Sequence, residues 1–135
     1  MNREQFIQHT SDEYGMEGEY LWPKYPLLCV FRHSRNRKWF AIVMDVPKNK
    51  LGLAGTDALD VVNLKCDPLL IGSLRKEPGI FPAYHMSKAN WISVALDGSV
   101  PDEQIKMLLG MSYDATAPKA KRKTSSKKPR KEERT

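Results

Sequence analysis

Apolar residues recur at helical spacing in three stretches of the chain. The first stretch ends at Gly15, a residue type that commonly closes a helix. The second begins with Asp67-Pro68, an N-cap followed by proline at the first helical position. The expected caps are Asn2 paired with Gln5, Asp67, and Ser99 or Asp102. The expected core positions of these helices are Phe6, Ile7, Thr10 and Tyr14; Leu69, Leu70 and Leu74, with Ile71 as a further candidate; and Ile105, Leu108, Leu109 and Tyr113.

Between these helices, runs of β-branched and aromatic residues predict strands. The polar run 33–38 predicts a hairpin turn, and 48–56 a glycine-containing loop. Strands in succession with helices elsewhere favour a mainly antiparallel sheet with helices packed on one face, so we predict an α+β fold. The expected strands are 27–32, 39–46, 59–65 and 91–96, with 80–86 extended or irregular.

Charge divides the chain into two unequal parts. Residues 1–117 hold 13 Lys and Arg against 14 Asp and Glu, whereas residues 118–135 hold nine against two and contain no large apolar side chain. A segment with nothing to bury cannot offset the entropy lost on ordering it. We therefore predict one domain over 1–117, a usual size for a single core, and a disordered basic tail over 118–135.

The composition disfavours membrane-spanning and secreted classes of protein. No apolar run approaches the roughly 18 residues of a membrane span, and the first residues lack the pattern of a secretory signal. The two cysteines, Cys29 and Cys66, each lie in an apolar segment. We expect both to be buried and reduced in a cytoplasmic protein, and one disulfide between them is the alternative.

The basic tail predicts a polyanionic partner, because closely spaced cations gain free energy by releasing counterions from nucleic acid. A solubilising extension is the alternative interpretation. The basic hairpin 32–38 has the charge and shape to contact a phosphate backbone, but polar residues also gather at any solvated hairpin tip. Trp39 begins an alternating strand, so we expect it in the core rather than as a stacking platform.

Candidate chemistry elsewhere is less specific. The segment 82–91 mixes aromatic rings, an imidazole and a lysine, which is equally typical of a binding surface and of a packed irregular segment. Cys66, Asp67 and His85 are a conceivable catalytic or metal-binding set, but they lack the paired local spacing of such sites. We therefore expect no enzymatic activity, no cofactor and no metal.

Two blocks of sequence carry a resemblance to a known family. They are 64–68, Leu-Lys-Cys-Asp-Pro, and 84–91, Tyr-His-Met-x-Lys-x-x-Trp. With these and shorter blocks, residues 1–116 resemble the MmcQ/YjbR family. The resemblance implies a CyaY-like α+β fold, DNA binding through a double-wing arrangement, and no established enzymatic activity. Ser87 stands where the family motif most often has Asn. The signature positions of the family correspond to Lys65, Asp67, Tyr84, His85, Lys88 and Trp91.

The sequence therefore predicts a nucleic-acid-binding protein, with DNA as the expected partner, RNA as a further one, and no membrane; the oligomeric state is left open. The alternative is a non-enzymatic adaptor that binds a protein or a small anionic metabolite near Tyr84, His85 and Lys88. The candidate nucleic-acid-binding residues are Arg32, Arg35, Arg37, Lys38, Lys65, Tyr84, His85, Lys88, Lys119, Lys121, Arg122, Lys123, Lys127, Lys128, Arg130 and Lys131.

Overall fold

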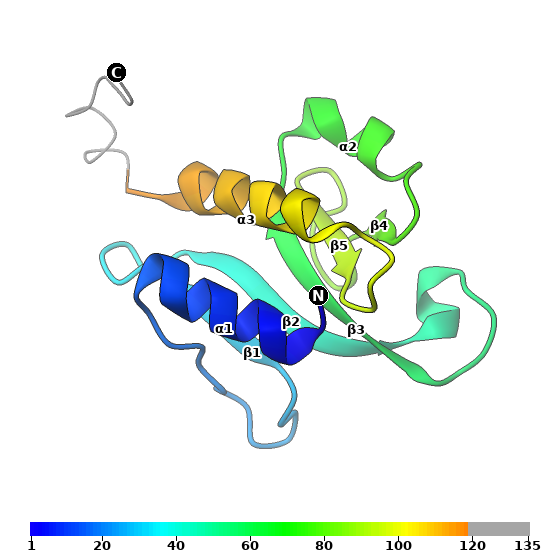
Figure 1. Ribbon diagram of the computed structural model, residues 1–135, viewed down its shortest axis with the longest axis horizontal. Helices are drawn as coiled ribbons and strands as arrows, with labels where there is room; N and C mark the ends of the chain where they lie inside the picture. Colours follow the sequence, from blue (N-terminus) through cyan, green and yellow to red (C-terminus); the bar gives the residue numbers. More distant parts are fainter. Residues whose placement is uncertain (119–135) are drawn as a thin grey trace.

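Five antiparallel strands form one sheet in the order β1-β2-β3-β5-β4, and α1 and α3 lie across one of its faces (Figure 1). The computed structural model describes residues 1–118. The predicted α+β class and the predicted order of elements are confirmed. The elements are α1 (Arg3–Tyr14), β1 (Cys29–Arg32), β2 (Trp39–Pro47), the 3-10 helix η1 (Lys48–Leu51), β3 (Ala58–Lys65), α2 (Pro68–Leu74), β4 (Ile80–Pro82), β5 (Trp91–Ala95) and α3 (Asp102–Thr116).

The face beneath α1 and α3 holds the larger of two apolar clusters. Successive side chains of a strand point to opposite faces. Accordingly, Val62 and Leu64 of β3 belong to the cluster under the helices, whereas Val61 belongs to the cluster on the other face. Tyr14 of α1 stacks on Tyr113 of α3 with ring centroids 4.3 Å apart, which ties the two helices to each other above the sheet.

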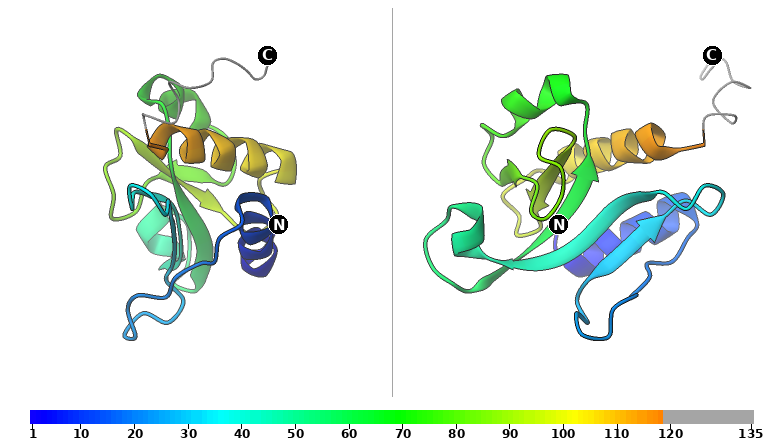
Figure 2. Two further views of the ribbon diagram at one scale, coloured as in Figure 1. Left: turned by 90° about the vertical axis from the view of Figure 1, so that its left-hand side faces the viewer. Right: turned by 180° about the vertical axis from the view of Figure 1, so that it is seen from behind.

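The opposite face of the sheet is covered by irregular segments and η1, and we call it the outer face (Figure 2). Its buried cluster comprises Val30, Ile42, Met44, Val46, Leu59, Val61 and Ala95. The partly buried side chains that pack on this cluster are Trp22, Leu28, Trp39, Leu51, Phe81, Tyr84, Met86 and Trp91. Because none of the α-helices within residues 1–118 covers these side chains, several aromatic rings remain partly accessible on the outer face.

The caps predicted for the first two helices are confirmed. The Asn2 side chain accepts a hydrogen bond from the Gln5 backbone N–H at 2.8 Å, and the Gln5 side chain accepts one from the Asn2 N–H at 2.9 Å. Gly15 ends α1 with φ of 65°, in the left-handed region. At α2, the Asp67 carboxylate accepts from the Leu69 N–H at 2.9 Å. These local signals place both helix starts correctly because each involves residues within three positions of one another.

The predicted caps of the last helix are wrong. Pro101 is the N-cap of α3 and makes no side-chain hydrogen bond, and Asp102 is the first helical residue. The Ser99 hydroxyl instead donates to the Asp97 carboxylate at 2.6 Å, within the preceding turn. The carboxylates of Asp102 and Glu103 in the first turn still favour this helix start through the helix dipole.

Two further expectations are corrected. In α2, Leu69 is 89% exposed and Leu70 41% exposed, whereas Ile71 is buried. A helix of seven residues that contacts the core through one side buries the residue facing the sheet, and Leu69, two positions away, faces solvent. The first strand begins at Cys29 instead of Leu27, because the Leu27 carbonyl accepts a hydrogen bond from the Arg3 guanidinium at 2.6 Å.

The basic segment falls outside most of the structure. The described part of the chain ends two residues after α3, at Pro118. The tail predicted over 118–135 therefore lies, apart from its first residue, outside the described residues, and its disorder stays a prediction. Among the helices of residues 1–118, none combines the length and the apolar character needed to cross a membrane.

Candidate nucleic-acid interface

The turn between β1 and β2 presents cations at one end of the sheet. The His33 N–H donates to the Lys38 carbonyl at 2.9 Å, which closes the hairpin 33–38. Arg37 adopts a left-handed conformation with φ of 64°, a rare state for a residue with a Cβ. Arg35, Arg37 and Lys38 are all exposed. The predicted hairpin is confirmed, and three of its candidate side chains are accessible to a partner.

Arg32, the fourth candidate in this region, is already paired. Its Nε and one terminal nitrogen donate to the two carboxylate oxygens of Glu19 at 3.0 and 2.7 Å. The hydrogen bond from Arg32 is the main reason why the pKa of Glu19 lies below its usual value. Glu19 also forms an isolated antiparallel bridge with Val30. Arg32 therefore links the segment before β1 to the sheet, and the proposed interface does not include it.

The end of α3 docks against the base of the same hairpin. His33 is buried, and its Nε2 lies 3.0 Å from the Tyr113 carbonyl oxygen and 2.9 Å from Oγ1 of Thr116. The Asn36 side chain donates to the Thr116 carbonyl at 2.9 Å. Figure 1 shows this end of α3 beside the turn between β1 and β2. The chain that follows Thr116 therefore starts next to the exposed cations of the hairpin.

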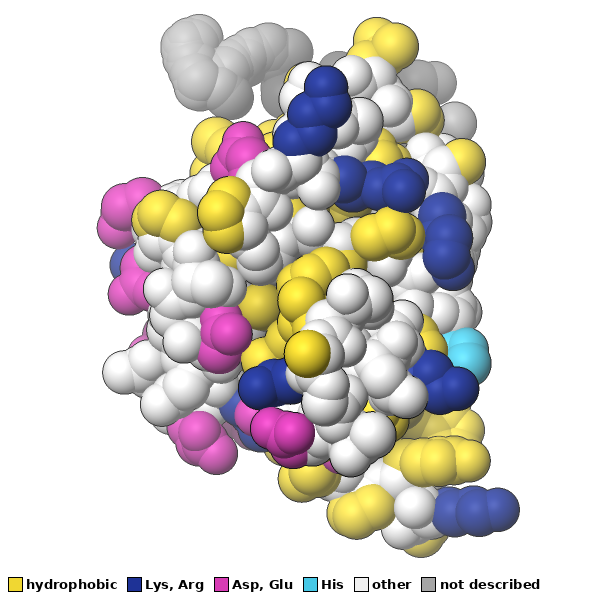
Figure 3. All heavy atoms as spheres, turned by 90° about the vertical axis from the view of Figure 1, so that its right-hand side faces the viewer, with side chains coloured by type: hydrophobic (Ala, Val, Ile, Leu, Met, Phe, Trp, Pro, Cys, Tyr) yellow, Lys and Arg dark blue, Asp and Glu magenta, His cyan; other side chains and the backbone are white. Residues whose placement is uncertain are grey.

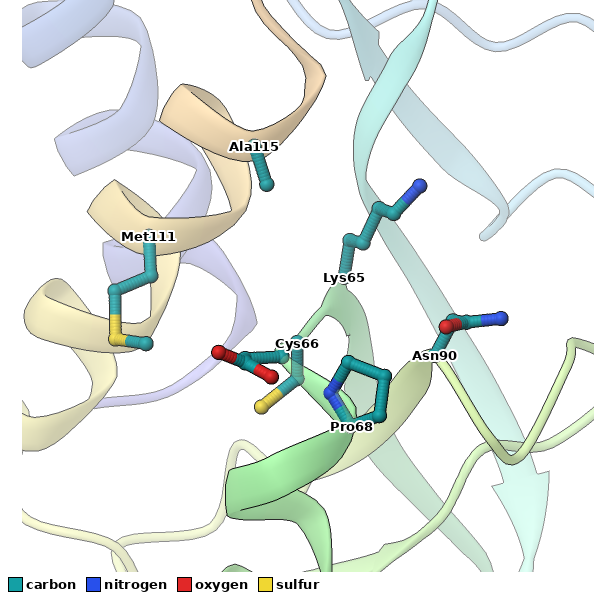
Figure 4. Close-up of a pocket in the computed structure, with 7 residues that line it drawn as sticks. Lys65, Cys66, Pro68, Asn90, Met111 and Ala115 are labelled. Atoms are coloured by element: carbon teal, nitrogen blue, oxygen red, sulfur yellow. The ribbon is translucent and has the colours of Figure 1, made fainter.

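Ser112 of α3 links the strands that carry the rest of the candidate site. Its buried hydroxyl accepts a hydrogen bond from the Lys65 N–H at 2.9 Å and donates one to the Phe40 carbonyl at 2.6 Å. The side chain of Lys65 extends away from Cys66 and Met111 (Figure 4). Ser112 thus fixes the end of β3 against the start of β2. The backbone of Lys65, the last residue of β3, is held in place by the same contact.

A buried polar network fixes the turn that holds Tyr84 and His85. The Asn63 amide donates to the Tyr84 carbonyl at 2.9 Å, and the Ser93 hydroxyl accepts from the Tyr84 N–H at 3.0 Å. Ser93 in turn donates to the Asn63 side-chain oxygen. The next residue, His85, has φ of 61°, and its ring lies with its centroid 3.9 Å from that of Tyr84. Both backbone groups of Tyr84 are therefore satisfied inside the sheet.

Tyr84, His85 and Lys88 do not surround a single pocket. Tyr84 and His85 line a cavity of about 360 Å³ together with Tyr25 and Asp45. Lys88 lines a different cavity, of about 150 Å³, which it shares with Tyr84. Its ammonium group donates to the Ala83 carbonyl at 3.0 Å. The three side chains that the sequence grouped together therefore face two separate hollows.

Cys66 and Asp67 line a third cavity, of about 310 Å³, between the end of β3 and α3 (Figure 4). Cys29 and Cys66 are both free and buried, as expected. Burial, and then the Asp67 carboxylate, raise the pKa of the Cys66 thiol. His85 belongs to a different cavity. Within residues 1–118, no group of three His, Cys, Asp or Glu side chains is placed to hold a metal ion.

Cys66 is expected to react slowly in the native protein. A raised pKa leaves less thiolate at a given pH, and the side chain is only 5% exposed. Iodoacetamide at about pH 8 should label Cys66 at least about tenfold more slowly in the folded chain than in urea. Peptide mass spectrometry over time measures both rates. Equally fast labelling of folded and unfolded protein would instead indicate an activated cysteine.

The charged side chains of the folded part are unevenly distributed. Figure 3 views the molecule from the side that carries α2 and η1, with the helix-covered face toward the left. Most acidic side chains in this view lie on that left side, whereas most Lys and Arg lie at the top and toward the right. An overall charge near zero in 1–117 thus conceals regions of opposite sign.

These features define a small α+β domain whose candidate site lies at strand ends and turns. The chain belongs to the YjbR family, whose model matches residues 13–115, and the family resemblance of the sequence is confirmed. It is 39% identical to the uncharacterized protein YyaQ of Bacillus subtilis over 116 residues, which cover 86% of this chain and 98% of that protein. It is 42% identical to the uncharacterized protein YjbR of Escherichia coli K12 over 66 residues, or 46% of this chain and 56% of that protein.

Solved structures agree with the fold. The crystal structure of a Pseudomonas syringae protein, 46% identical, matches with a TM-score of 0.85 over 87% of this chain and 100% of that one. A Deinococcus radiodurans protein, 27% identical, matches with a TM-score of 0.56 over 78% of this chain and 74% of its own. These relatives support the fold and the family without assigning a partner.

The structure brings together some of the candidate residues and leaves others outside. Arg35, Arg37 and Lys38 lie at one end of the sheet, and Lys65 lies at the same end because β2 and β3 are antiparallel. Sequence reasoning missed the residues that position the candidate site, which are Asn36 at the hairpin, Ser112 at Lys65 and Asn63 at Tyr84. The one sequence signal for them was the polar residue Asn63 inside an apolar strand, which indicates a buried hydrogen-bonding partner. The candidates beyond the described residues are Lys119, Lys121, Arg122, Lys123, Lys127, Lys128, Arg130 and Lys131.

Proposed function

We propose that this protein is a non-enzymatic DNA-binding protein of the cytoplasm, in which the hairpin 33–38 and the basic segment 119–135 act together. The observation that carries the proposal is the docking of the end of α3 on the hairpin through Asn36 and His33. This contact holds Thr116, three residues before the basic segment, against the hairpin that carries three exposed cations. Free, buried cysteines support the cytoplasmic assignment.

The physical basis is the release of counterions from a polyanion. Each phosphate neutralised by Lys or Arg contributes about −0.9 to the slope of log affinity against log salt concentration for duplex DNA. Arg35, Arg37 and Lys38 supply a fixed group of charges, and the nine Lys and Arg of 119–135 supply the larger number. The hairpin and the turn after β4 are our candidates for the double-wing arrangement that the family resemblance implies. RNA offers the same phosphates, so we include it as a further partner.

The adaptor alternative has weaker support in the geometry. It requires Tyr84, His85 and Lys88 to bind one small anion, but His85 and Lys88 line different cavities. The Lys88 ammonium also already donates one hydrogen bond to the Ala83 carbonyl. For an enzymatic role, the raised pKa of Cys66 disfavours a nucleophilic thiol.

Removing two hairpin charges tests the proposal on the folded part of the protein. The double variant Arg35→Gln/Arg37→Gln should bind duplex DNA more weakly at low salt, and its salt slope should be less steep by roughly 2. Fluorescence anisotropy with a labelled duplex measures both quantities. The matched control is Lys76→Gln/Lys106→Gln, which removes the same charge from the end of α2 and from α3. Equal slopes for the two double variants would contradict a role for the hairpin.

A further inference from the structure

Two tryptophans and a lysine lie in a row across the end of the sheet. Trp39 begins β2, Lys65 ends β3 and Trp91 begins β5. Because β2, β3 and β5 are neighbouring antiparallel strands, these three positions fall at the same end of the sheet. Neighbouring strands are about 4.8 Å apart, so β2 and β5 are separated by about 10 Å. The row therefore has the dimensions of a short binding surface.

Strand alternation assigns all three side chains to the outer face, and Lys65 also borders the cavity beside α3. Trp39, which the sequence placed in the core, is only partly buried, and like Trp91 it packs on the apolar cluster of the outer face while remaining partly exposed. Lys65 is the direct cross-strand partner of Trp91, so the two side chains stand next to each other on one face. Val61, four residues before Lys65 in the same strand, belongs to the outer cluster as well. Lys65 thus lies on the strand between the two strands that carry the partly exposed indole rings.

Further cations precede both tryptophans in the chain. Lys38 directly precedes Trp39, and with Arg35 and Arg37 it extends the row into the basic hairpin. The network of Asn63 and Ser93 described above holds the backbone of Tyr84, and the turn that follows contains Lys88. Rings alternating with cations along a sheet surface are the features by which proteins bind single-stranded nucleic acid, since every base has a face that can stack.

We propose that single-stranded nucleic acid binds across this row, with bases stacked on Trp39 and Trp91 and with Lys65 contacting the phosphate between them. This inference deepens the proposed function and rests on it. Duplex bases are stacked on each other and are not free to stack on protein rings, whereas unpaired bases are. The hairpin and the basic segment would hold the backbone of either form, and the tryptophan row adds a preference for unpaired bases.

Replacing Trp91 tests the stacking directly in the full chain. Trp91→Leu should lower the affinity for oligothymidylate of about 12 nucleotides by about 5- to 150-fold, which is the usual effect of removing one stacking ring. Binding of a blunt duplex should stay within twofold. Trp91→Phe keeps a ring on the same strand and should retain most of the single-strand affinity. The chain has three tryptophans, so quenching of intrinsic fluorescence by the oligonucleotide reports stacking in the wild type.

Lys65→Gln keeps the apolar packing of Trp91 intact and provides a second route if Trp91→Leu does not fold. It should weaken single-strand binding about 3- to 10-fold, whereas the control Lys106→Gln on α3 should not. If both Trp91→Leu and Lys65→Gln leave single-strand binding unchanged while duplex binding persists, the tryptophan row is not the site and the proposed function stands. If the wild type binds neither form, both proposals fail.

Discussion

Removal of residues 119–135 is expected to lower the affinity for duplex DNA at low salt by at least about 100-fold. The deleted segment contains nine Lys and Arg, and it is joined to α3 at the point where the helix docks on the basic hairpin. If about five of these cations contact phosphates, the salt slope should also become less steep by about 4 to 5. Anisotropy titrations of full-length and truncated protein at two salt concentrations measure both effects.

The truncation has controls for folding and for charge. The cut after Pro118 keeps Thr116 and its hydrogen bonds to His33 and Asn36, so the melting temperature should stay almost unchanged. A full-length variant with all nine Lys and Arg of the segment replaced by Gln should bind as weakly as the truncated chain. Equal duplex binding by the full-length and truncated proteins would show that the basic segment has no role in DNA binding.

Asn63→Leu is expected to destabilise the folded domain by about 3 kcal/mol. Asn63 is fully buried and satisfies the Tyr84 carbonyl and the Ser93 hydroxyl. Leucine fills a similar volume but leaves both partners without a hydrogen bond in the protein interior, at a cost of about 1–3 kcal/mol each. Some of this loss is offset by the added apolar burial. Urea unfolding followed by circular dichroism measures the free energy of unfolding.

The Asn63 variant also distinguishes the contributions of two parts of the proposed interface, the turn at Tyr84 and the hairpin. Loss of its hydrogen bond should loosen the turn at Tyr84 while leaving the docking of Asn36 on α3 in place. Duplex binding at a temperature where the variant is folded should therefore lose only the contribution of this turn and keep that of the hairpin and the basic segment. The exposed Asn49 of η1 provides the matched control, and Asn49→Leu should alter stability by less than about 0.5 kcal/mol. A similar free energy of unfolding for the two variants would contradict a structural role for the Asn63 network.

Local sequence signals predicted the elements well. The capping box of Asn2 and the Asp67-Pro68 start involve residues close together in the chain, so their chemistry was visible in the sequence. The failures arise where tertiary packing overrides the local pattern. Leu69 is apolar yet exposed, since a seven-residue helix at the edge of the domain buries only the side that holds Ile71. Nothing in the order of residues indicated which leucines that side would include.

The sequence indicated which charged residues belong to the candidate site, but not how they are arranged in space. A polar run between two strands predicted that Arg35 and Arg37 would project, and they do. The pairing of Arg32 with Glu19 and the docking of Asn36 on Thr116 join residues 13 and 80 positions apart. Such contacts depend on how the whole chain folds, so no local pattern could identify them. They decide which cations are accessible and where the basic segment begins.

The most direct test of the account is a salt titration of duplex binding by the full-length protein. Binding at low salt should be readily measurable, and log affinity should fall linearly against log salt concentration with a slope of roughly −6 to −7. Such a slope would reflect about seven phosphates neutralised by the hairpin and the basic segment together. The absence of a complex at low salt, or an affinity that does not change with salt, would contradict nucleic-acid binding by these cations.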